Sequence, residues 1–259
     1  MPEGHTIHRL ARLHRPVLVG QEVAASSPQG RFAEGADLLD GEKVERIEAF
    51  GKHLFYHWSG AQILHVHLGL FGRFRTFRRE PPEPTDGTRL AMRTDEATLY
   101  LSGPTACELL SVDERDDIVD RLGPDPLRRG ADRGVFEANL DRRSIAVAAA
   151  LLDQKVVAGV GNVYRAEILF MAGIDPHRRA RDLTAEERER VWELTGQELR
   201  RGEKAGRIIT VEPADVGASR RSDLGSRERL YVYKRGGKPC RRCGTAIELD
   251  EIGNRKVWW

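Results

Sequence analysis

The sequence has few cysteines, few aromatic residues and no long apolar run. Three cysteines in 259 residues, Cys107, Cys240 and Cys243, do not build a disulfide framework and suit a reducing compartment. No apolar stretch approaches the roughly 20 residues of a membrane span, and the amino terminus lacks the basic-then-apolar pattern of a signal peptide. We therefore expect a cytoplasmic protein that makes no use of a membrane.

A net excess of one charge is also missing, because the formal net charge is only +2. The arginines are clustered instead, at residues 73–79, 178–181 and 220–229, whereas acidic residues gather at 113–120. Any one cluster is explained by a solvated face. Several basic clusters with aromatic residues between them favour a surface that binds phosphates.

The apolar pattern divides the chain into two parts. Apolar residues recur at helical spacing over residues 7–18, and short, partly alternating runs follow at 44–50, 54–58, 63–68, 90–93 and 98–101. This spacing predicts an amino-terminal β-sandwich or barrel that is opened by a helix. Residues 122–130, rich in Gly, Pro and Arg, predict a linker.

Beyond this linker the period becomes helical. Residues 145–152 and 163–171 predict two helices separated by a turn, and Thr184 with Glu187 forms a capping box that starts a third. Short strands are expected near residues 231–233, 247–249 and 257–259. The predicted class is therefore α+β in two domains: a β-sandwich with flanking helices at 1–121, a linker at 122–134, a helical domain at 135–230 and a terminal β-hairpin at 231–259.

The amino terminus carries a candidate nucleophile. A small second residue favours removal of Met1, which would expose the secondary amine of Pro2. An α-amino group has a pKa of about 8, roughly two units below that of lysine, so part of it is unprotonated at neutral pH. A secondary amine that attacks a sugar C1′ forms a permanently charged iminium, and Glu3 could protonate the ring oxygen. The alternative is an ordinary processed terminus, since Met-Pro starts are common.

Several motifs join this terminus in one pattern. They are Pro2-Glu3-Gly4, Gly51-Lys52, and the segments 67–72, 122–127, 152–170 and 231–243. In this order and over essentially the whole chain they resemble the formamidopyrimidine-DNA glycosylase and endonuclease VIII family, and look most like its actinobacterial endonuclease VIII-like branch. The resemblance implies a bifunctional DNA glycosylase and AP lyase of base excision repair. Its expected partner is double-stranded DNA with damaged bases or abasic sites, bound by a monomer that is nucleoid-associated when on DNA.

The resemblance also implies roles for the catalytic residues. Pro2 is the nucleophile that forms the imine, and Glu3 is the general acid and base. Lys52 contacts a phosphate beside the lesion and assists proton transfer, although without the resemblance a solvated turn residue would be preferred. Glu167 matches a family glutamate near the catalytic amine, with a surface helix carboxylate as the alternative.

Residues 154–167 match the family's helix-two-turns-helix element. Glycines at 159 and 161 would let the backbone approach a phosphate, and Asn162 adds a side-chain donor. A dinucleotide fingerprint is the alternative, but the third glycine and the preceding strand are missing.

An apolar pair, Leu70 and Phe71, matches the family's wedge. Such a wedge fills the gap that an everted base leaves in the stack, and returns part of the few kcal/mol spent on unstacking. The two residues are flanked by glycines. A place in the hydrophobic core explains the pair equally well.

Cys240 and Cys243 form a CxxC knuckle of the kind that supplies two thiolates to a tetrahedral zinc. The family's zinc finger has a second CxxC directly after a segment like residues 253–259, where this sequence stops. We expect either a truncated finger with half of a structural zinc site or a finger that works without metal; no catalytic cofactor is needed. The resemblance makes Arg255 the finger arginine that inserts at the lesion phosphates.

Seven of the eight histidines lie before residue 68 and invite a metal hypothesis: His5, His8, His14, His53, His57, His65 and His67. Without an acidic partner at ligand spacing, solvated or hydrogen-bonded histidines are favoured. Two other functions stay open, a catalytically silent damaged-DNA-binding module and a zinc-ribbon protein. The preferred lesion stays open, because the loop around residues 212–229, which is expected to line the pocket, cannot be folded from the sequence. The use of single strands and the extent of elimination stay open too.

Overall fold

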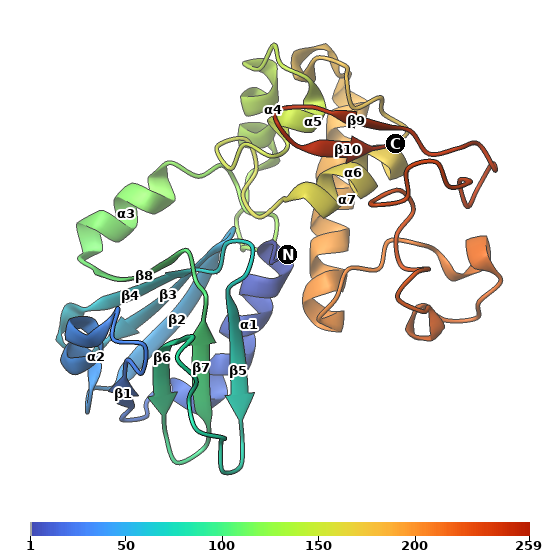
Figure 1. Cartoon of the computed structure of the whole chain (residues 1–259). Helices are drawn as coiled ribbons and strands as arrows, with labels where there is room; N and C mark the ends of the chain where they lie inside the picture. The colour runs from blue at the N-terminus through green and yellow to red at the C-terminus, as the bar shows by residue number, and fades with distance from the viewer. Residues whose placement is uncertain (1) are drawn as a thin grey trace. The chain divides into compact units, whose positions relative to one another are not determined.

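The structure is a computed structural model that describes residues 2–259 (Figure 1). The chain divides into two compact units, Met1–Arg121 and Leu122–Trp259. Each unit has a hydrophobic core of its own. Within residues 2–259, no helix is both long and apolar enough to cross a membrane.

The first unit contains two four-stranded antiparallel sheets, so the predicted β-sandwich with flanking helices is confirmed. One sheet has the order β1 (Ala24–Ser26), β6 (Thr88–Arg93), β7 (Thr98–Ser102), β5 (Arg73–Phe77). The other has the order β2 (Val44–Phe50), β3 (His53–Trp58), β4 (Ile63–His67), β8 (Ala106–Leu110). The helices are α1 (Gly4–Leu18), α2 (Ala33–Leu39) and α3 (Val112–Asp120), with a short 3-10 turn η1 (Ser59–Ala61).

Helix α1 packs on the sheet through β2, as Figure 1 shows. Ile7, Ala11 and Leu18 recur at helical spacing and are fully or almost fully buried, which explains why the periodic segment forms a helix on this core. The acidic run at 113–120 lies in helix α3, which begins with a capping box formed by Ser111 and Glu114.

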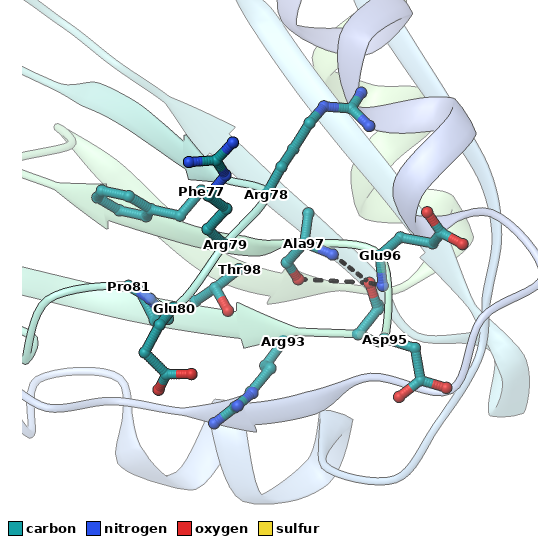
Figure 2. Close-up of a pocket in the computed structure, with 11 residues that line it drawn as sticks. Phe77, Arg78, Arg79, Glu80, Pro81, Arg93, Asp95, Glu96, Ala97 and Thr98 are labelled. Carbon is teal, nitrogen blue, oxygen red and sulfur yellow. Dashed lines mark hydrogen bonds between the residues drawn. The ribbon is translucent and has the colours of Figure 1, made fainter.

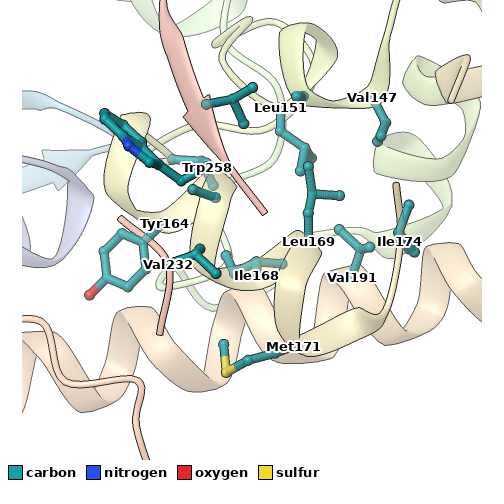
Figure 3. Packing of buried hydrophobic residues seen from close by; sticks show 14 of the residues in the cluster. Val147, Leu151, Tyr164, Ile168, Leu169, Met171, Ile174, Val191, Val232 and Trp258 are labelled. Carbon is teal, nitrogen blue, oxygen red and sulfur yellow. The ribbon is translucent and has the colours of Figure 1, made fainter. Parts of the chain in front are cut away.

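The second unit is mainly helical. Its helices are α4 (Arg133–Asp141), α5 (Val147–Ala150), α6 (Asn162–Ala172) and α7 (Ala185–Ala205), with 3-10 turns η2 (Ala180–Asp182), η3 (Pro213–Val216) and η4 (Arg221–Asp223). The final hairpin pairs β9 (Leu249–Glu251) with β10 (Lys256–Trp258). Figure 3 shows the core that α6 shares with its neighbours, in which Leu151, Leu169, Val191 and Trp258 are buried.

Two predicted helices of this unit have different outcomes. The capping box at Thr184 and Glu187 is confirmed and starts α7. The helix expected at 145–152 is shorter, because the backbone before it pairs with residues 178–180: Val147 N–H donates to the Arg178 carbonyl at 2.7 Å, and Ala180 N–H to that of Ile145 at 2.9 Å.

Residues 122–134, expected to be a linker, belong to the second unit and pack within it. Gly123 N–H donates to the Gln154 carbonyl at 2.8 Å, and a Cβ at Gly123 would lie 2.6 Å from the Val156 carbonyl carbon. Ala158 N–H donates to the Pro124 carbonyl at 3.1 Å. The glycine and prolines therefore make a close backbone approach here, and α4 begins before the segment ends, at Arg133.

Candidate functional site

Pro2 and Glu3 lead into helix α1. Glu3 is the N-cap residue with extended backbone, and its carbonyl accepts the N–H of Thr6 at 2.9 Å. Its side chain makes no cap hydrogen bond and is fully buried, at 0% exposure, whereas Pro2 is half-buried. The fold thus holds a carboxyl shielded from water next to the candidate nucleophile. Met1 lies outside the described residues, so its removal stays a prediction.

Lys52 lies at the tip of the β2–β3 hairpin. Phe50 pairs with His53, which leaves a two-residue turn of Gly51 and Lys52. Gly51 has a φ of 56°, the left-handed value that a first turn residue of this kind requires and that glycine adopts without strain. The predicted tight connection is confirmed, and it presents Lys52 half-buried at the sheet end.

Beneath this turn, a hydrogen-bonded chain of side chains crosses the sheet. His53 Nδ1 lies 2.9 Å from His65 Nε2, and His65 Nδ1 lies 2.9 Å from a Glu108 carboxylate oxygen. Since the carboxylate accepts, the chain orders the tautomers: His65 donates to Glu108 and accepts from His53. The His67 ring lies 5.1 Å from that of His53. The hydrogen-bonded interpretation is thereby confirmed for His53 and His65.

Burial lowers the pKa of His53 to about 3, with further lowering from His65, His67 and Lys52. Burial also lowers the pKa of His67. The imidazoles beside Lys52 therefore stay neutral at physiological pH. No group of three or more His, Cys, Asp or Glu side chains within residues 2–259 is arranged to hold a metal ion.

Acid should destabilise the first unit through its buried histidines. Burial lowers the pKa of His14, 1% exposed, from 6.5 to about 3. The unfolded chain therefore binds a proton that the folded unit does not, so stability is full above pH 6.5 and is lost as pH falls below it. At pH 5 the loss from His14 alone is about 2 kcal/mol. Urea unfolding at pH 7.5 and pH 5, followed by Trp58 fluorescence with the other three tryptophans replaced by Phe, measures it.

His14→Gln, which can still reach the Tyr56 hydroxyl that His14 Nδ1 meets at 2.7 Å, should reduce this pH dependence. His177→Gln is the control, because that exposed histidine lies in the second unit, and the rise in its pKa that comes from hydrogen bonding to Asp250 should leave the Trp58 transition unchanged. An unchanged difference between the two pH values in His14→Gln would contradict the assignment.

Leu70 and Phe71 lie in a tight loop after β4, and the core interpretation of this pair is wrong. Leu70 is 49% exposed and Phe71 86% exposed. The loop closes through a 2.9 Å hydrogen bond from Gly72 N–H to the Leu68 carbonyl. A Cβ at Gly72 would meet that same carbonyl oxygen, so glycine is required for the turn that projects the pair.

The arginine cluster at 73–79 separates into two parts. Residues 73–77 form strand β5, which the sequence pattern did not predict. Arg78 and Arg79 line a pocket of about 210 Å³ together with acidic residues, among them Asp95 and Glu96 (Figure 2). This end of the cluster is therefore a surface of mixed charge, which supports the solvated-face alternative for it.

In the second unit, the turn before α6 is braced by one side chain. Gln154 accepts the Gly159 N–H at 3.0 Å and donates to the carbonyls of Leu152 and Val160 at 3.0 and 2.9 Å. Gly159 has a φ of 95°, which a side chain would strain, and Gly161 is the N-cap of α6. The helix N-terminus is thus held in a fixed conformation suited to bind an anion.

Asn162 and the Arg255 turn, 93 residues apart in sequence, come together in this unit. Asn162 donates to the carbonyl of Lys256 at 3.1 Å. The turn between β9 and β10 is closed by Ile252 N–H donating to the Arg255 carbonyl at 3.0 Å. Arg255 itself is exposed. Two predicted phosphate contacts are therefore presented by neighbouring backbone segments.

Glu167 is fully buried on α6, which excludes the surface-carboxylate alternative. One carboxylate oxygen accepts the Tyr231 N–H at 2.8 Å and the Thr210 hydroxyl. The other accepts the N–H groups of Val232 and Tyr233 at 2.9 and 2.8 Å. This explains why the strand expected at 231–233 does not form: its amide groups donate to a side chain instead of a neighbouring strand.

The two cysteines of the CxxC form a knuckle. Cys240 N–H donates to the Thr245 carbonyl at 2.7 Å, and Arg242 N–H points to Cys240 Sγ at 3.4 Å. Cys240 is buried and Cys243 exposed. Tetrahedral zinc needs four ligands, and the described residues gather no third one here. This pair alone does not fit a structural zinc.

Sequence reasoning missed Glu108 and Arg165. Glu108 meets His65 directly across the β4–β8 pair, but β8 was not predicted. Arg165 is fully buried on α6 and binds backbone carbonyls. Its signal was present, because an arginine in a mostly apolar helix indicates a buried polar contact.

Comparison with known proteins agrees with this arrangement. Residues 1–115 match the family described as Formamidopyrimidine-DNA glycosylase N-terminal domain, and residues 122–212 match the Formamidopyrimidine-DNA glycosylase H2TH domain. Endonuclease 8 1 of Mycobacterium tuberculosis is 44% identical over 100% of this chain and 98% of its own length. Formamidopyrimidine-DNA glycosylase of Thermus thermophilus is 33% identical over 98% and 95%.

Two solved structures share the fold. The MutM (Fpg) protein of Thermus thermophilus superposes with a TM-score of 0.79 at 30% identity, covering 100% of this chain and 97% of that one. Lactococcus lactis Fpg, in a complex with DNA containing an abasic site, gives 0.81 at 22% identity, covering 99% and 97%. The chain belongs to the formamidopyrimidine-DNA glycosylase and endonuclease VIII family.

Proposed function

We propose that this chain is a bifunctional DNA glycosylase and AP lyase that removes an oxidised base from double-stranded DNA and then cuts the strand. The observation that carries the proposal is the fully buried carboxyl of Glu3 beside Pro2 at the start of α1. Supporting it, relatives over the whole chain are named as glycosylase and endonuclease, and the Lactococcus lactis structure contains abasic-site DNA.

The first chemical step joins enzyme and sugar. The lone pair of the Pro2 nitrogen forms a bond to C1′ of the everted nucleotide, and the bond from C1′ to the base breaks. The base leaves with the proton that the Pro2 nitrogen gives up. Glu3 protonates the ring oxygen O4′, so the C1′–O4′ bond opens and the nitrogen becomes a charged iminium. Burial of Glu3 keeps this proton from exchanging freely with bulk water.

The iminium then drives strand cleavage. Loss of a proton from C2′ breaks the C3′–O3′ bond and releases the 3′ phosphate (β-elimination). Loss of a second proton, from C4′, breaks the C5′–O5′ bond and releases the 5′ phosphate (δ-elimination). Water hydrolyses the iminium and regenerates the Pro2 amine. Lys52 provides a positive charge for the departing phosphate, next to imidazoles that stay neutral.

Binding of the DNA backbone falls to the second unit in this proposal. The N-terminus of α6, the Asn162 amide and the Arg255 guanidinium supply donors for phosphate oxygens. In this proposal Glu167 does not contact the DNA. Its buried carboxylate fixes the backbone of residues 231–233 through hydrogen bonds. Structural zinc on Cys240 and Cys243 stays a prediction that requires two further ligands. The cytoplasmic location and the monomeric state also stay predictions.

Phe71→Ala should weaken base excision from duplex DNA by about tenfold, because the wedge no longer fills the vacated stack. At 86% exposure, Phe71 contributes little to folding, so the stability of the first unit should change by less than about 0.5 kcal/mol. Val112→Ala, which truncates another exposed apolar residue of the same unit, is the control. Equal losses in both variants, or none in Phe71→Ala, would remove the wedge role.

The rival function is a DNA-binding module without catalysis. Incubation of the full chain with a duplex that contains one abasic site separates the two, with products resolved by gel and mass spectrometry. The proposal predicts strand scission that leaves a 3′ phosphate after both eliminations, or a 3′ unsaturated aldehyde after the first alone. Tight binding without scission would favour the rival.

A further inference from the structure

We infer that Arg165 is a positioning residue whose buried guanidinium clamps the turn that carries Arg255, so that this turn is held without a metal. The inference rests on the proposed function in one respect, namely that Arg255 binds DNA phosphate. The clamp itself is a property of the second unit alone.

The contacts of Arg165 are made to backbone carbonyls. Nη2 donates to the carbonyls of Arg255 at 3.0 Å and Lys256 at 3.1 Å. Nη1 donates to those of Ala148 at 3.0 Å and Ile252 at 3.4 Å. Two of these four acceptors, Ile252 and Arg255, lie in the β9–β10 turn, Lys256 is the first residue of β10, and Ala148 belongs to α5. One side chain thus ties the turn to two helices.

A buried charge with such partners has a structural task. The side chain of Arg165 is at 0% exposure, and an unpartnered cation there would be strongly unfavourable. The carbonyls solvate the charge in place of water, and hydrogen bonds from a charged donor are stronger than neutral ones. The planar guanidinium can reach both sides of the turn at once, which the single ammonium of lysine cannot.

Besides the Asn162 hydrogen bond to Lys256 and the burial of Val257 and Trp258, the turn depends on a short hairpin. The strands β9 and β10 form only three residue pairs, and a two-stranded hairpin of this size is marginal by itself. Gly253 and Asn254 both have left-handed backbone, with φ of 63° and 57°. The nearby CxxC provides two thiols where a metal would need four ligands.

A second buried charge on the same helix completes the arrangement. Glu167 lies two residues after Arg165 on α6. Its carboxylate accepts the three N–H groups of residues 231–233, whereas Arg165 donates to carbonyls of residues 252–256. Helix α6 therefore holds the C-terminal segment with two buried charges. The Glu167 carboxylate accepts backbone N–H groups, and the Arg165 guanidinium donates to backbone carbonyls. The Trp258 ring packs edge-on against the Tyr233 ring, with 4.7 Å between the two ring centroids.

Hydrogen–deuterium exchange of the full chain tests the clamp. In Arg165→Met, amides of the peptide covering residues 249–258 should exchange at least tenfold faster, while peptides of the first unit stay unchanged. Asp250→Asn is the matched control, because it removes an exposed contact of the same hairpin, the 2.9 Å pair with His177, and should change the exchange little. Arg165→Lys keeps the charge and serves as the test of the clamp if Arg165→Met does not fold. Its amides at residues 249–258 should also exchange faster than those of wild type.

Binding to a duplex with a stable abasic-site analogue connects the clamp to function. Arg165→Met and Arg255→Ala should each weaken binding by about tenfold, and the double variant no more than either alone, since both remove the same contact. Arg255→Ala should leave the hairpin exchange unchanged. If wild type does not bind the duplex, the proposed function fails, and the exchange experiment still decides on the clamp.

Three outcomes would overturn the inference. Wild-type exchange rates at residues 249–258 in the Arg165 variants would show that the guanidinium does not hold the turn. Multiplied losses of binding in the double variant would show that Arg165 acts independently of Arg255. Treatment of wild type with EDTA should leave the exchange at residues 249–258 unchanged. An increase that matches that of Arg165→Met would show that a bound metal holds the turn.

Discussion

Glu3→Gln should lower the single-turnover rate of base excision by two to four orders of magnitude, the range typical for loss of a general acid. The substitution keeps the size and shape of a side chain that is fully buried, so the fold should accommodate it. A carboxamide has no proton to give to O4′, and the ring oxygen would leave without assistance. The measurement is the rate of base release from a duplex that contains one oxidised pyrimidine, with enzyme in excess.

Two comparisons make this result specific. On a duplex with a ready-made abasic site the base is already gone, so Glu3→Gln should slow strand scission less than it slows base release. Glu45→Gln, at an exposed position of the same unit, should retain the wild-type rate. A Glu3→Gln enzyme that excises bases within threefold of wild type would show that another group supplies the proton.

Glu167→Gln should lower the free energy of unfolding of the second unit by about 3 kcal/mol or more. The buried carboxylate accepts from three backbone N–H groups and one hydroxyl, and both of its oxygens are used. A carboxamide turns one acceptor into a donor that faces other donors, so buried N–H groups lose their partner. The unfolding midpoint should fall by about 10 °C.

Thermal unfolding followed by tryptophan fluorescence suits this test, because Trp192, Trp258 and Trp259 all lie in the second unit. Glu187→Gln is the matched control: it weakens the α7 cap and the ion pair with Arg178, both more exposed, and should cost less than about 1 kcal/mol. Equal shifts of the unfolding midpoint in the two variants would mean that the buried hydrogen bonds of Glu167 stabilise the second unit no more than the exposed contacts of Glu187.

Features that depend on neighbouring residues could be predicted from the sequence. The strand at residues 44–50 was predicted with its observed bounds, because its pattern is local and its ends are marked. The Gly51-Lys52 turn and the Thr184 cap follow from backbone rules that involve two to four residues. The residues of the motifs were identified through the resemblance to the family, and their roles stay predictions.

Features that depend on distant partners could not be predicted. Glu108 meets His65 only through the pairing of β8 with β4, and residues 106–110 have no alternation that marks a strand. Residues 231–233 have the composition of a strand, but a carboxylate 64 positions earlier takes up their amides. The approach of Asn162 to the Arg255 turn depends on how a hairpin docks on α6. Such contacts are decided by tertiary packing, which overrides local propensity.

The proposed chemistry depends on a covalent bond between the Pro2 amine and the sugar. The most direct test is borohydride trapping on an abasic-site duplex, using protein whose mass shows that Met1 is absent, followed by proteolysis to locate the adduct. We expect a stable protein–DNA adduct on the peptide that begins at Pro2, and its loss or relocation in Pro2→Gly. A Met-free protein that binds the duplex but gives no adduct, or an adduct on a lysine in wild type, would contradict it.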